Sequence, residues 1–178
     1  GFGDRTGIEL PGEIRGMVHP PKTWSKISIT RIPMGQEVGV TPLQMIVAMS
    51  TIANGGKLVQ PRIVKSIIDD HGKPLSVLRP TDVRQVISPE TASKIAFALR
   101  GVATKRGTAA EAAVPGFTIS GKTGTAQKAA PNGGYEKNKY VVSFSGFLPS
   151  ENPAFVGLVV LDDDHPKDPN LNYGGTVA

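Results

Sequence analysis

The stretch "GFTISGKTGTAQ", residues 116–127, carries the most informative motif in the chain. From Gly116 to Thr123 it fits the phosphate-loop pattern G-x-x-x-x-G-K-[ST]. From Lys122 onward it gives Lys-Thr-Gly-Thr, which places an ammonium and two hydroxyl groups around a glycine. The two interpretations require different surroundings, so the flanking sequence distinguishes them.

The flanking sequence does not favour a phosphate loop. Such a loop needs a strand before it and a helix after it, because the helix N-terminus and the loop amides bind the phosphates. Here "AAEAAVP" precedes the stretch and "KAAPNGG" follows it. The apolar run that ends at Asp162 resembles a magnesium-binding strand, but any buried strand that ends in an acid does so. An ATP-binding protein would require a helix that starts at Lys122.

A strand over the motif fits the residues better. Side chains alternate along a strand, so Thr123 and Thr125 project to one side and Lys122 to the other. Gly124 allows a ligand or a second backbone to approach closely. An ammonium and two hydroxyls around a glycine make a plausible carboxylate site. A structural strand with an exposed lysine would give the same letters.

The sequence beyond the motif predicts more strands. "KYVVSFSGFLP" and "AFVGLVVLDDD" are strand-like and are joined by short, turn-rich pieces. Short connections favour antiparallel neighbours. We also expect strands at residues 25–32, 62–69 and 75–78.

Helices are predicted mainly before the motif. Thr41 as N-cap and Pro42 in the first turn start one helix, which the glycines after Asn54 end. Ser88 starts a second, which runs to about Val102. A capping box from Thr108 to Glu111 predicts a short third. Helices followed by a strand meander indicate an α+β fold in which an antiparallel sheet is flanked by helices.

Composition sets outer bounds. The 178 residues suffice for one domain, with 39% hydrophobic content. The net charge of +5 comes from scattered basic residues, which gives little support to a nucleic-acid partner. There is no cysteine, so disulfides and thiolate chemistry are excluded. No run approaches the roughly 18–20 apolar residues of a membrane span, and we expect any membrane anchor to lie outside this chain.

Four stretches give the chain a strong resemblance to one family. They are "GFGDRTGIELPGE", "MGQEVGVTPLQMIVAMSTIANGGKLVQPRIV", "SGKTGTAQK" with "SFSGFLP", and the final "YGGTVA". In this order they resemble the C-terminal part of the transpeptidase domain of class B penicillin-binding proteins. The resemblance covers essentially the whole chain, residues 1–178, and implies part of the penicillin-binding, serine β-lactamase-like fold.

The family's chemistry is acyl transfer in peptidoglycan synthesis. A serine in S-x-x-K attacks a D-Ala-D-Ala peptide and forms an acyl-enzyme, and β-lactams mimic that donor. By resemblance, Lys122 is the third-motif lysine, and Thr123 and Thr125 bind the carboxylate of the substrate or antibiotic. The Thr125 amide would contribute to the oxyanion hole, and Gly124 would keep the strand clear of the ligand. The resemblance implies no cofactor.

The nucleophile is missing from these residues. No serine is followed three residues later by lysine, and Ser150-Glu151-Asn152, the one S-x-N match, follows the K-T-G motif instead of preceding it. We interpret residues 150–152 as a turn. The chain is therefore expected to be a fragment, inactive alone, that pairs with the missing N-terminal part of its domain or self-associates through an open sheet edge. A non-catalytic penicillin-binding-like module is the alternative.

Two further expectations concern metal and location. Asp162-Asp163-Asp164-His165 is a weak metal pattern, because successive residues on an extended chain point in opposite directions; a solvated loop is the preferred interpretation. The resemblance places the parent protein at the extracytoplasmic, periplasmic face of the bacterial inner membrane. It does not separate a role in cell division from one in elongation.

Overall fold

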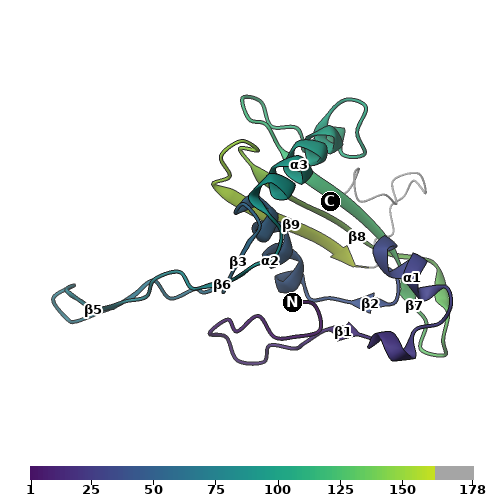
Figure 1. The fold of residues 1–178 in the computed structure, drawn as a ribbon, viewed down its shortest axis with the longest axis horizontal. Coiled ribbons are helices and arrows are strands. Elements are labelled where there is room, and N and C mark those ends of the chain that lie inside the picture. Colours follow the sequence, from purple (N-terminus) through teal and green to yellow (C-terminus); the bar gives the residue numbers. More distant parts are fainter. Residues whose placement is uncertain (163–178) are drawn as a thin grey trace.

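A three-stranded antiparallel sheet forms the body of the molecule (Figure 1). The computed structural model describes residues 1–162. The strands are β7 (Ser120–Ala129), β8 (Tyr135–Leu148) and β9 (Phe155–Asp162), in the order β7-β8-β9. Short connections make consecutive strands neighbours, so the predicted antiparallel meander is confirmed.

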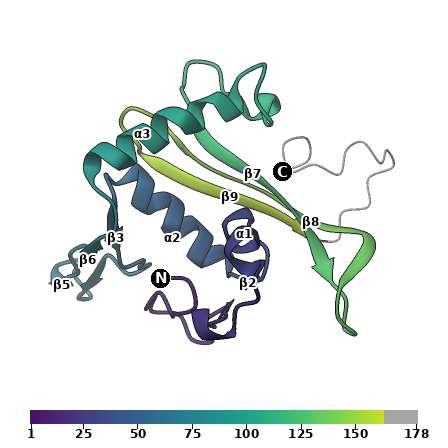
Figure 2. The same cartoon turned by 45° about the vertical axis from the view of Figure 1, so that its right-hand side comes forward.

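Two helices pack on this sheet (Figure 2). Helix α2 (Pro42–Ala53) contacts β8 and β9, and helix α3 (Pro89–Arg100) contacts β7 and α2. Both begin as the sequence predicts, with Thr41 and Ser88 as N-caps and proline in the first turn. A 3₁₀ turn, Gly101–Ala103, extends α3 to about the predicted end. The α+β class is confirmed.

An arm of two short ladders projects from the body (Figure 1). Strand β3 (Lys57–Val59) pairs with β6 (Asp82–Gln85) at its root. Strand β4 (Ser66–Ile68) pairs with β5 (Pro74–Val77) further out. The predicted strand over residues 62–69 is thus confirmed only in its last part.

The N-terminal segment lies beside the sheet and contains little regular structure. Strands β1 (Met17–Val18) and β2 (Val38–Gly39) pair with each other, and 3₁₀ turns occur at Pro21–Thr23 and Ile32–Met34. The strand expected over residues 25–32 is wrong, because helix α1 (Ser28–Arg31) occupies this place. The Ser25 amide donates to Ser28 Oγ at 3.0 Å, and such a local bond favours a turn over a strand.

The predicted third helix is also wrong in its form. A single 3₁₀ turn, Ala110–Ala112, replaces it, and no side chain caps this turn. Thr108, the expected cap, instead places its hydroxyl 3.1 Å from the hydroxyl of Thr123. A contact in the tertiary fold has therefore replaced the local cap that the sequence pattern predicted.

The core is small for the size of the chain. Phe147 and Val142 are fully buried, and Met49, Ala92 and Ala109 are the other buried hydrophobic residues among those described. Many large hydrophobic side chains stay exposed, including Phe155 and Val159 of β9. Within residues 1–162, none of the helices has the length and apolar character that a membrane crossing requires.

Candidate functional site

The K-T-G motif lies on an outer strand of the sheet. Among the described residues β7 pairs only with β8, so its other edge is open. In the register, Lys122 is opposite Ser145, Thr123 opposite Phe144 and Thr125 opposite Val142. Thr123 and Thr125 therefore share one face, as the sequence predicts.

Lys122 is exposed and folds along the open edge. Its Nζ donates a hydrogen bond to the Thr123 carbonyl oxygen at 2.7 Å. In an antiparallel strand both backbone groups of a residue point the same way and alternate residue by residue, so the backbone groups of Thr125 point the same way as those of Thr123.

Two glycines of β7 lie directly against side chains of β8. A Cβ on Gly124 would lie 2.5 Å from Ser143 Oγ, and one on Gly121 would lie 2.5 Å from the Phe144 ring. From the sequence, Gly124 is expected to leave room for a ligand. The structure adds a second cause, because Gly124 makes room for a serine of the neighbouring strand.

A loop after α3 reaches the motif. Thr108 contacts Thr123 through their hydroxyls, and the loop is held by bonds from the Gly107 amide to the Thr104 carbonyl and from the Ala109 amide to the Val102 carbonyl. Thr108 is exposed, so this hydroxyl pair sits at the surface of the candidate site. The sequence does not indicate that Thr108 contacts the motif, because its spacing to Glu111 fits a capping box.

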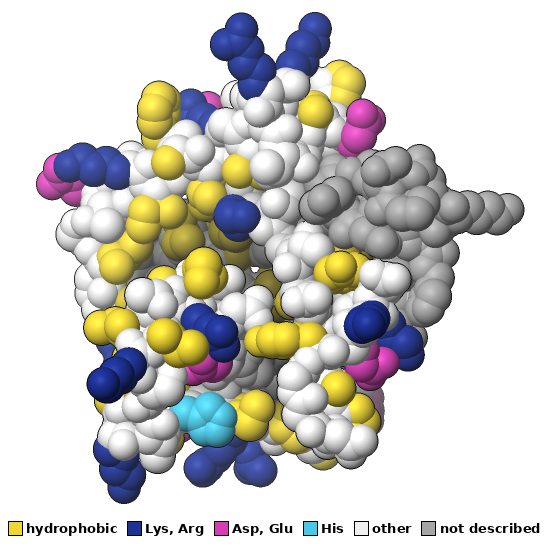
Figure 3. Space-filling model, turned by 90° about the vertical axis from the view of Figure 1, so that its right-hand side faces the viewer, with side chains coloured by type: hydrophobic (Ala, Val, Ile, Leu, Met, Phe, Trp, Pro, Cys, Tyr) yellow, Lys and Arg dark blue, Asp and Glu magenta, His cyan; other side chains and the backbone are white. Residues whose placement is uncertain are grey.

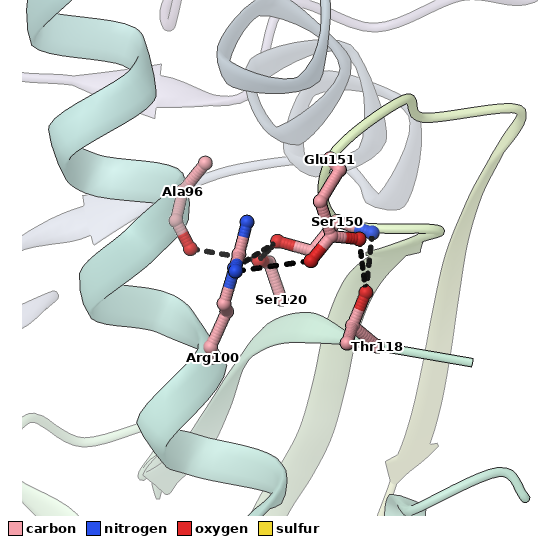
Figure 4. Close-up of polar contacts among 6 residues, drawn as sticks. All are labelled: Ala96, Arg100, Thr118, Ser120, Ser150 and Glu151. Carbon is pink, nitrogen blue, oxygen red and sulfur yellow. Dashed lines mark hydrogen bonds and ion pairs between the residues drawn. The ribbon is translucent and has the colours of Figure 1, made fainter. Parts of the chain in front are cut away.

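A buried polar cluster anchors the start of β7 (Figure 4). Ser120 Oγ donates to the Ala96 carbonyl of α3 at 2.7 Å and lies 2.6 Å from Ser150 Oγ. Arg100 Nε donates to Ser150 Oγ at 2.8 Å. Since Ser120 and Ser150 are almost fully buried and hydrogen-bonded, the cluster holds the motif strand against α3.

The same cluster shows the role of Ser150, the serine of the S-x-N match. Ser150 and Glu151 lie in the bend between β8 and β9, as the sequence argument expects. Arg100 Nη1 and the Glu151 carboxylate form an ion pair at 3.0 Å. The Thr118 hydroxyl donates to the same carboxylate and, with the positive charge of Arg100 as a smaller cause, holds the pKa of Glu151 below its usual value. Ser150 is a structural residue.

The N-terminal loop is tied to α2 by one glutamine. Gln44 Nε2 donates to the carbonyls of Asp4 and Arg15, both at 2.8 Å, and its Oε1 accepts from the Thr41 amide. Within the loop, the Thr6 hydroxyl donates to the Glu13 carboxylate at 2.6 Å and lowers the pKa of Glu13. Gln44 thus completes a capping box and fixes a loop that comes 29 and 40 residues before it.

The face that includes α1 and the far end of β7 is hollowed (Figure 3). Hydrophobic side chains lie around the hollow, and others are spread over the same face. The N-terminal segment contributes several large exposed hydrophobic residues: Trp24, Ile27, Ile29 and Met34. Tyr135 connects this segment to the β7–β8 turn, since its hydroxyl donates to Gln36 Oε1 at 2.8 Å.

Of the weak metal pattern at residues 162–165, the structure describes only Asp162. Asp162 ends β9 and forms an ion pair with Lys128 at 3.0 Å. Residues 163–165 and the "YGGTVA" stretch lie outside the described residues. Within the part of the chain that is described, histidines and acids form no group of three that could hold a metal ion.

Comparison with known proteins gives consistent matches over the chain. The family described as penicillin binding protein transpeptidase domain matches residues 1–178. Stage V sporulation protein D of Bacillus subtilis is 41% identical over 100% of this chain and 27% of its own length. Penicillin-binding protein PbpB of Mycobacterium tuberculosis is 39% identical over 92% of this chain and 25% of its own length.

Solved structures agree with the sequence matches. Penicillin-binding protein 3 from Mycobacterium tuberculosis, complexed with aztreonam, superposes with a TM-score of 0.84 and 38% identity over 92% of this chain and 38% of that one. The transpeptidase domain of Burkholderia pseudomallei penicillin-binding protein 3 gives a TM-score of 0.82 and 32% identity over 99% of this chain and 51% of that one. The chain therefore spans about a quarter of these curated relatives and up to half of the compared structures.

Proposed function

Because the chain belongs to the penicillin-binding protein transpeptidase domain family, we propose that it is the C-terminal part of a peptidoglycan D,D-transpeptidase domain and supplies the K-T-G wall of the active site. The open edge of β7 is the observation that carries this proposal. Lys122, Thr123 and the Thr125 amide all face or border that edge, so a substrate laid along it would meet a positive charge and hydrogen-bond donors.

Each motif residue has a role in the proposal. The carboxylate of a stem peptide or β-lactam is bound by the hydroxyls of Thr123 and Thr125, with Lys122 adding charge. The Thr125 amide stabilises the oxyanion that develops on the attacked carbonyl. Gly124 has no side chain, so this part of the strand leaves room for the ligand. The nucleophilic serine of an S-x-x-K motif, which these 178 residues do not contain, completes the site from another segment.

A labelling experiment on the chain alone tests the missing nucleophile. The purified chain is incubated with a fluorescent penicillin, boiled and examined on a denaturing gel. We expect no covalent label, because no serine in the chain has the activating lysine of S-x-x-K. A label that survives boiling would contradict this assignment.

A chimera tests the motif itself. The chain replaces the matching segment of the Mycobacterium tuberculosis relative PbpB, and fluorescent penicillin then labels the chimera. Lys122→Ala and Thr123→Val should each slow labelling at least about tenfold, because each removes a group that binds the carboxylate of the penicillin. Lys137→Ala, an exposed lysine of β8, is the control and should label at the parent rate. Equal rates in all variants would exclude the motif from the site.

The partners and location follow from this function. Peptidoglycan stem peptides and β-lactams are the proposed ligands, and the periplasmic face of the inner membrane is the proposed site of action. The outer edge of β9 has no partner strand among the described residues, and Phe155 is 71% exposed beside it. Pairing with another segment of the domain or self-association would cover this edge. A clean monomer in sedimentation at high concentration would contradict self-association.

A further inference from the structure

The arm opens between its two ladders. The Gln60 amide donates to the Thr81 carbonyl and the Leu78 amide to the Lys65 carbonyl, but the residues between carry Pro61 and Pro80. Proline has no N–H to donate to a ladder, so pairing is interrupted here. A small pocket of about 120 Å³ lies at this interruption. Its walls are Glu9, Gln60, Arg62, Leu78, Arg79 and Thr81.

Arg62, in one wall of the pocket, has a guanidinium nitrogen that lacks an acceptor. Arg62 Nη1 is buried and has no hydrogen-bond partner among the described residues. Neither Arg62 nor Arg79 forms an ion pair with any described carboxylate, while Glu9 in the same pocket accepts from the Ile63 amide at 3.1 Å. A buried donor without an acceptor is costly, and a charged donor more so.

The charges around the pocket select the ligand. Two arginines and one glutamate leave one net positive charge, which a single carboxylate neutralises and a phosphate dianion exceeds. A carboxylate also matches the planar fork of a guanidinium, and Thr81 is a further polar residue of the pocket wall. Leu78, 37% exposed, gives apolar contact to the group that bears the carboxylate.

We infer that this pocket in the arm binds a peptide carboxylate, with Arg62 as its main contact. The site lies on other elements than the K-T-G strand, so it does not depend on the function proposed above. The carboxylate of a peptidoglycan stem peptide and that of a protein C-terminus share this chemistry. The configuration of the terminal residues distinguishes the two sources.

Binding is measured on the chain with ¹⁵N-labelled arginine, by following the side-chain Nε–Hε signals during titration. Sodium acetate is the first probe, with sodium chloride holding the ionic strength constant, and sodium phosphate is the second. Acetate should shift the Arg62 and Arg79 signals saturably and bind more tightly than phosphate. Arg62→Gln should weaken acetate binding at least about tenfold, since it removes a charge-assisted bidentate contact.

Two further variants serve as a control outside the pocket and as a test of the guanidinium shape. Arg84→Gln changes an exposed arginine of β6 outside the pocket and should leave acetate binding unchanged. Arg62→Lys keeps the charge but loses the fork, and should bind acetate with intermediate affinity. It also provides a folded variant if circular dichroism shows that Arg62→Gln does not fold. Shifts that do not saturate, that persist undiminished in Arg62→Gln or Arg62→Lys, or that favour phosphate over acetate would overturn the proposal.

A competition experiment identifies the source of the carboxylate. N-acetyl-D-alanyl-D-alanine and N-acetyl-L-alanyl-L-alanine each compete with acetate. Tighter binding of the D,D dipeptide supports a stem peptide, and tighter or equal binding of the L,L dipeptide supports a protein C-terminus. If neither dipeptide displaces acetate, the peptide assignment is wrong.

Discussion

The hydroxyl oxygens of Ser120 and Ser150 lie 2.6 Å apart, although the two residues are 30 positions apart in sequence (Figure 4). Their neighbours fix the direction of the hydrogen bonds. Arg100 can only donate to Ser150, and the Ala96 carbonyl can only accept from Ser120. Ser150 therefore donates to Ser120, and a single directed chain of donors runs from Arg100 to the backbone of α3.

Removal of the middle of this chain should destabilise the protein. Ser120→Ala leaves the Ser150 hydroxyl buried without its acceptor, and we expect a loss of about 1–2 kcal/mol in the free energy of unfolding. Urea unfolding measures this value. Ser76→Ala, an exposed serine of β5, is the matched control and should change stability by less than about 0.5 kcal/mol. Equal effects of the two substitutions would contradict the directed chain.

A side chain on the glycine in front of the motif lysine should destabilise the fold. Gly121→Ala places a methyl group against the Phe144 ring, and overpacking of this kind costs about 1–3 kcal/mol. The double variant Gly121→Ala/Phe144→Leu should recover part of the loss, measured as a coupling energy in urea unfolding. Gly157→Ala on β9 is the control, because its Cβ would meet nothing within 4 Å. Additive losses in the double variant would show that Phe144 is not the obstacle.

Gln44 should control the order of the N-terminal loop. Gln44→Glu keeps an acceptor for the Thr41 amide but loses both donors to Asp4 and Arg15, and it brings a carboxylate against two carbonyls. We expect a loss of about 1–3 kcal/mol in stability and faster amide hydrogen exchange in residues 4–18. Gln127→Glu, at an exposed position of β7, should leave the exchange of the loop unchanged. Unaltered exchange in Gln44→Glu would show that other contacts hold the loop.

The elements that the sequence predicted well depend on local interactions. Thr41 with Pro42, and Ser88 with Pro89, start helices through contacts within one turn, so their letters suffice. The alternation of Lys122, Thr123 and Thr125 follows from strand geometry alone. The resemblance then supplied the order of the motifs and their proposed chemistry.

The residues that the sequence did not predict take part in distant contacts. The sequence indicates only a turn at Ser150, because its partners, Ser120 and Arg100, are 30 and 50 residues away. Thr108 fitted a capping box, but its hydroxyl contacts Thr123 instead. Ser28 lies in an alternating pattern that favours a strand, yet its bond with Ser25 supports a helical turn. In each case the deciding partner is not visible in the local pattern.

Acid should weaken the Thr118–Glu151 contact as the carboxylate takes up a proton. The pKa of Glu151 is lower in the folded chain than in the unfolded chain, chiefly because the Thr118 hydroxyl donates to the carboxylate. A lowered folded pKa means that the contact stabilises the fold above the unfolded pKa and that this stabilisation is lost as pH falls through the folded pKa. Because Glu13 is also shifted downward, the test must be specific to one residue. Titration of the Glu151 carboxyl carbon by NMR meets this need.

Substitution of Thr118 then separates the causes of the shift. Thr118→Val removes the hydroxyl and should raise the pKa of Glu151 towards its usual value, whereas Thr118→Ser keeps the donor and should leave it low. Arg100→Gln should raise the pKa less than Thr118→Val does, because the charge of Arg100 is the smaller cause. If Arg100→Gln had the larger effect, the ion pair would dominate instead. The bend between β8 and β9 would then be held to α3 mainly by charge.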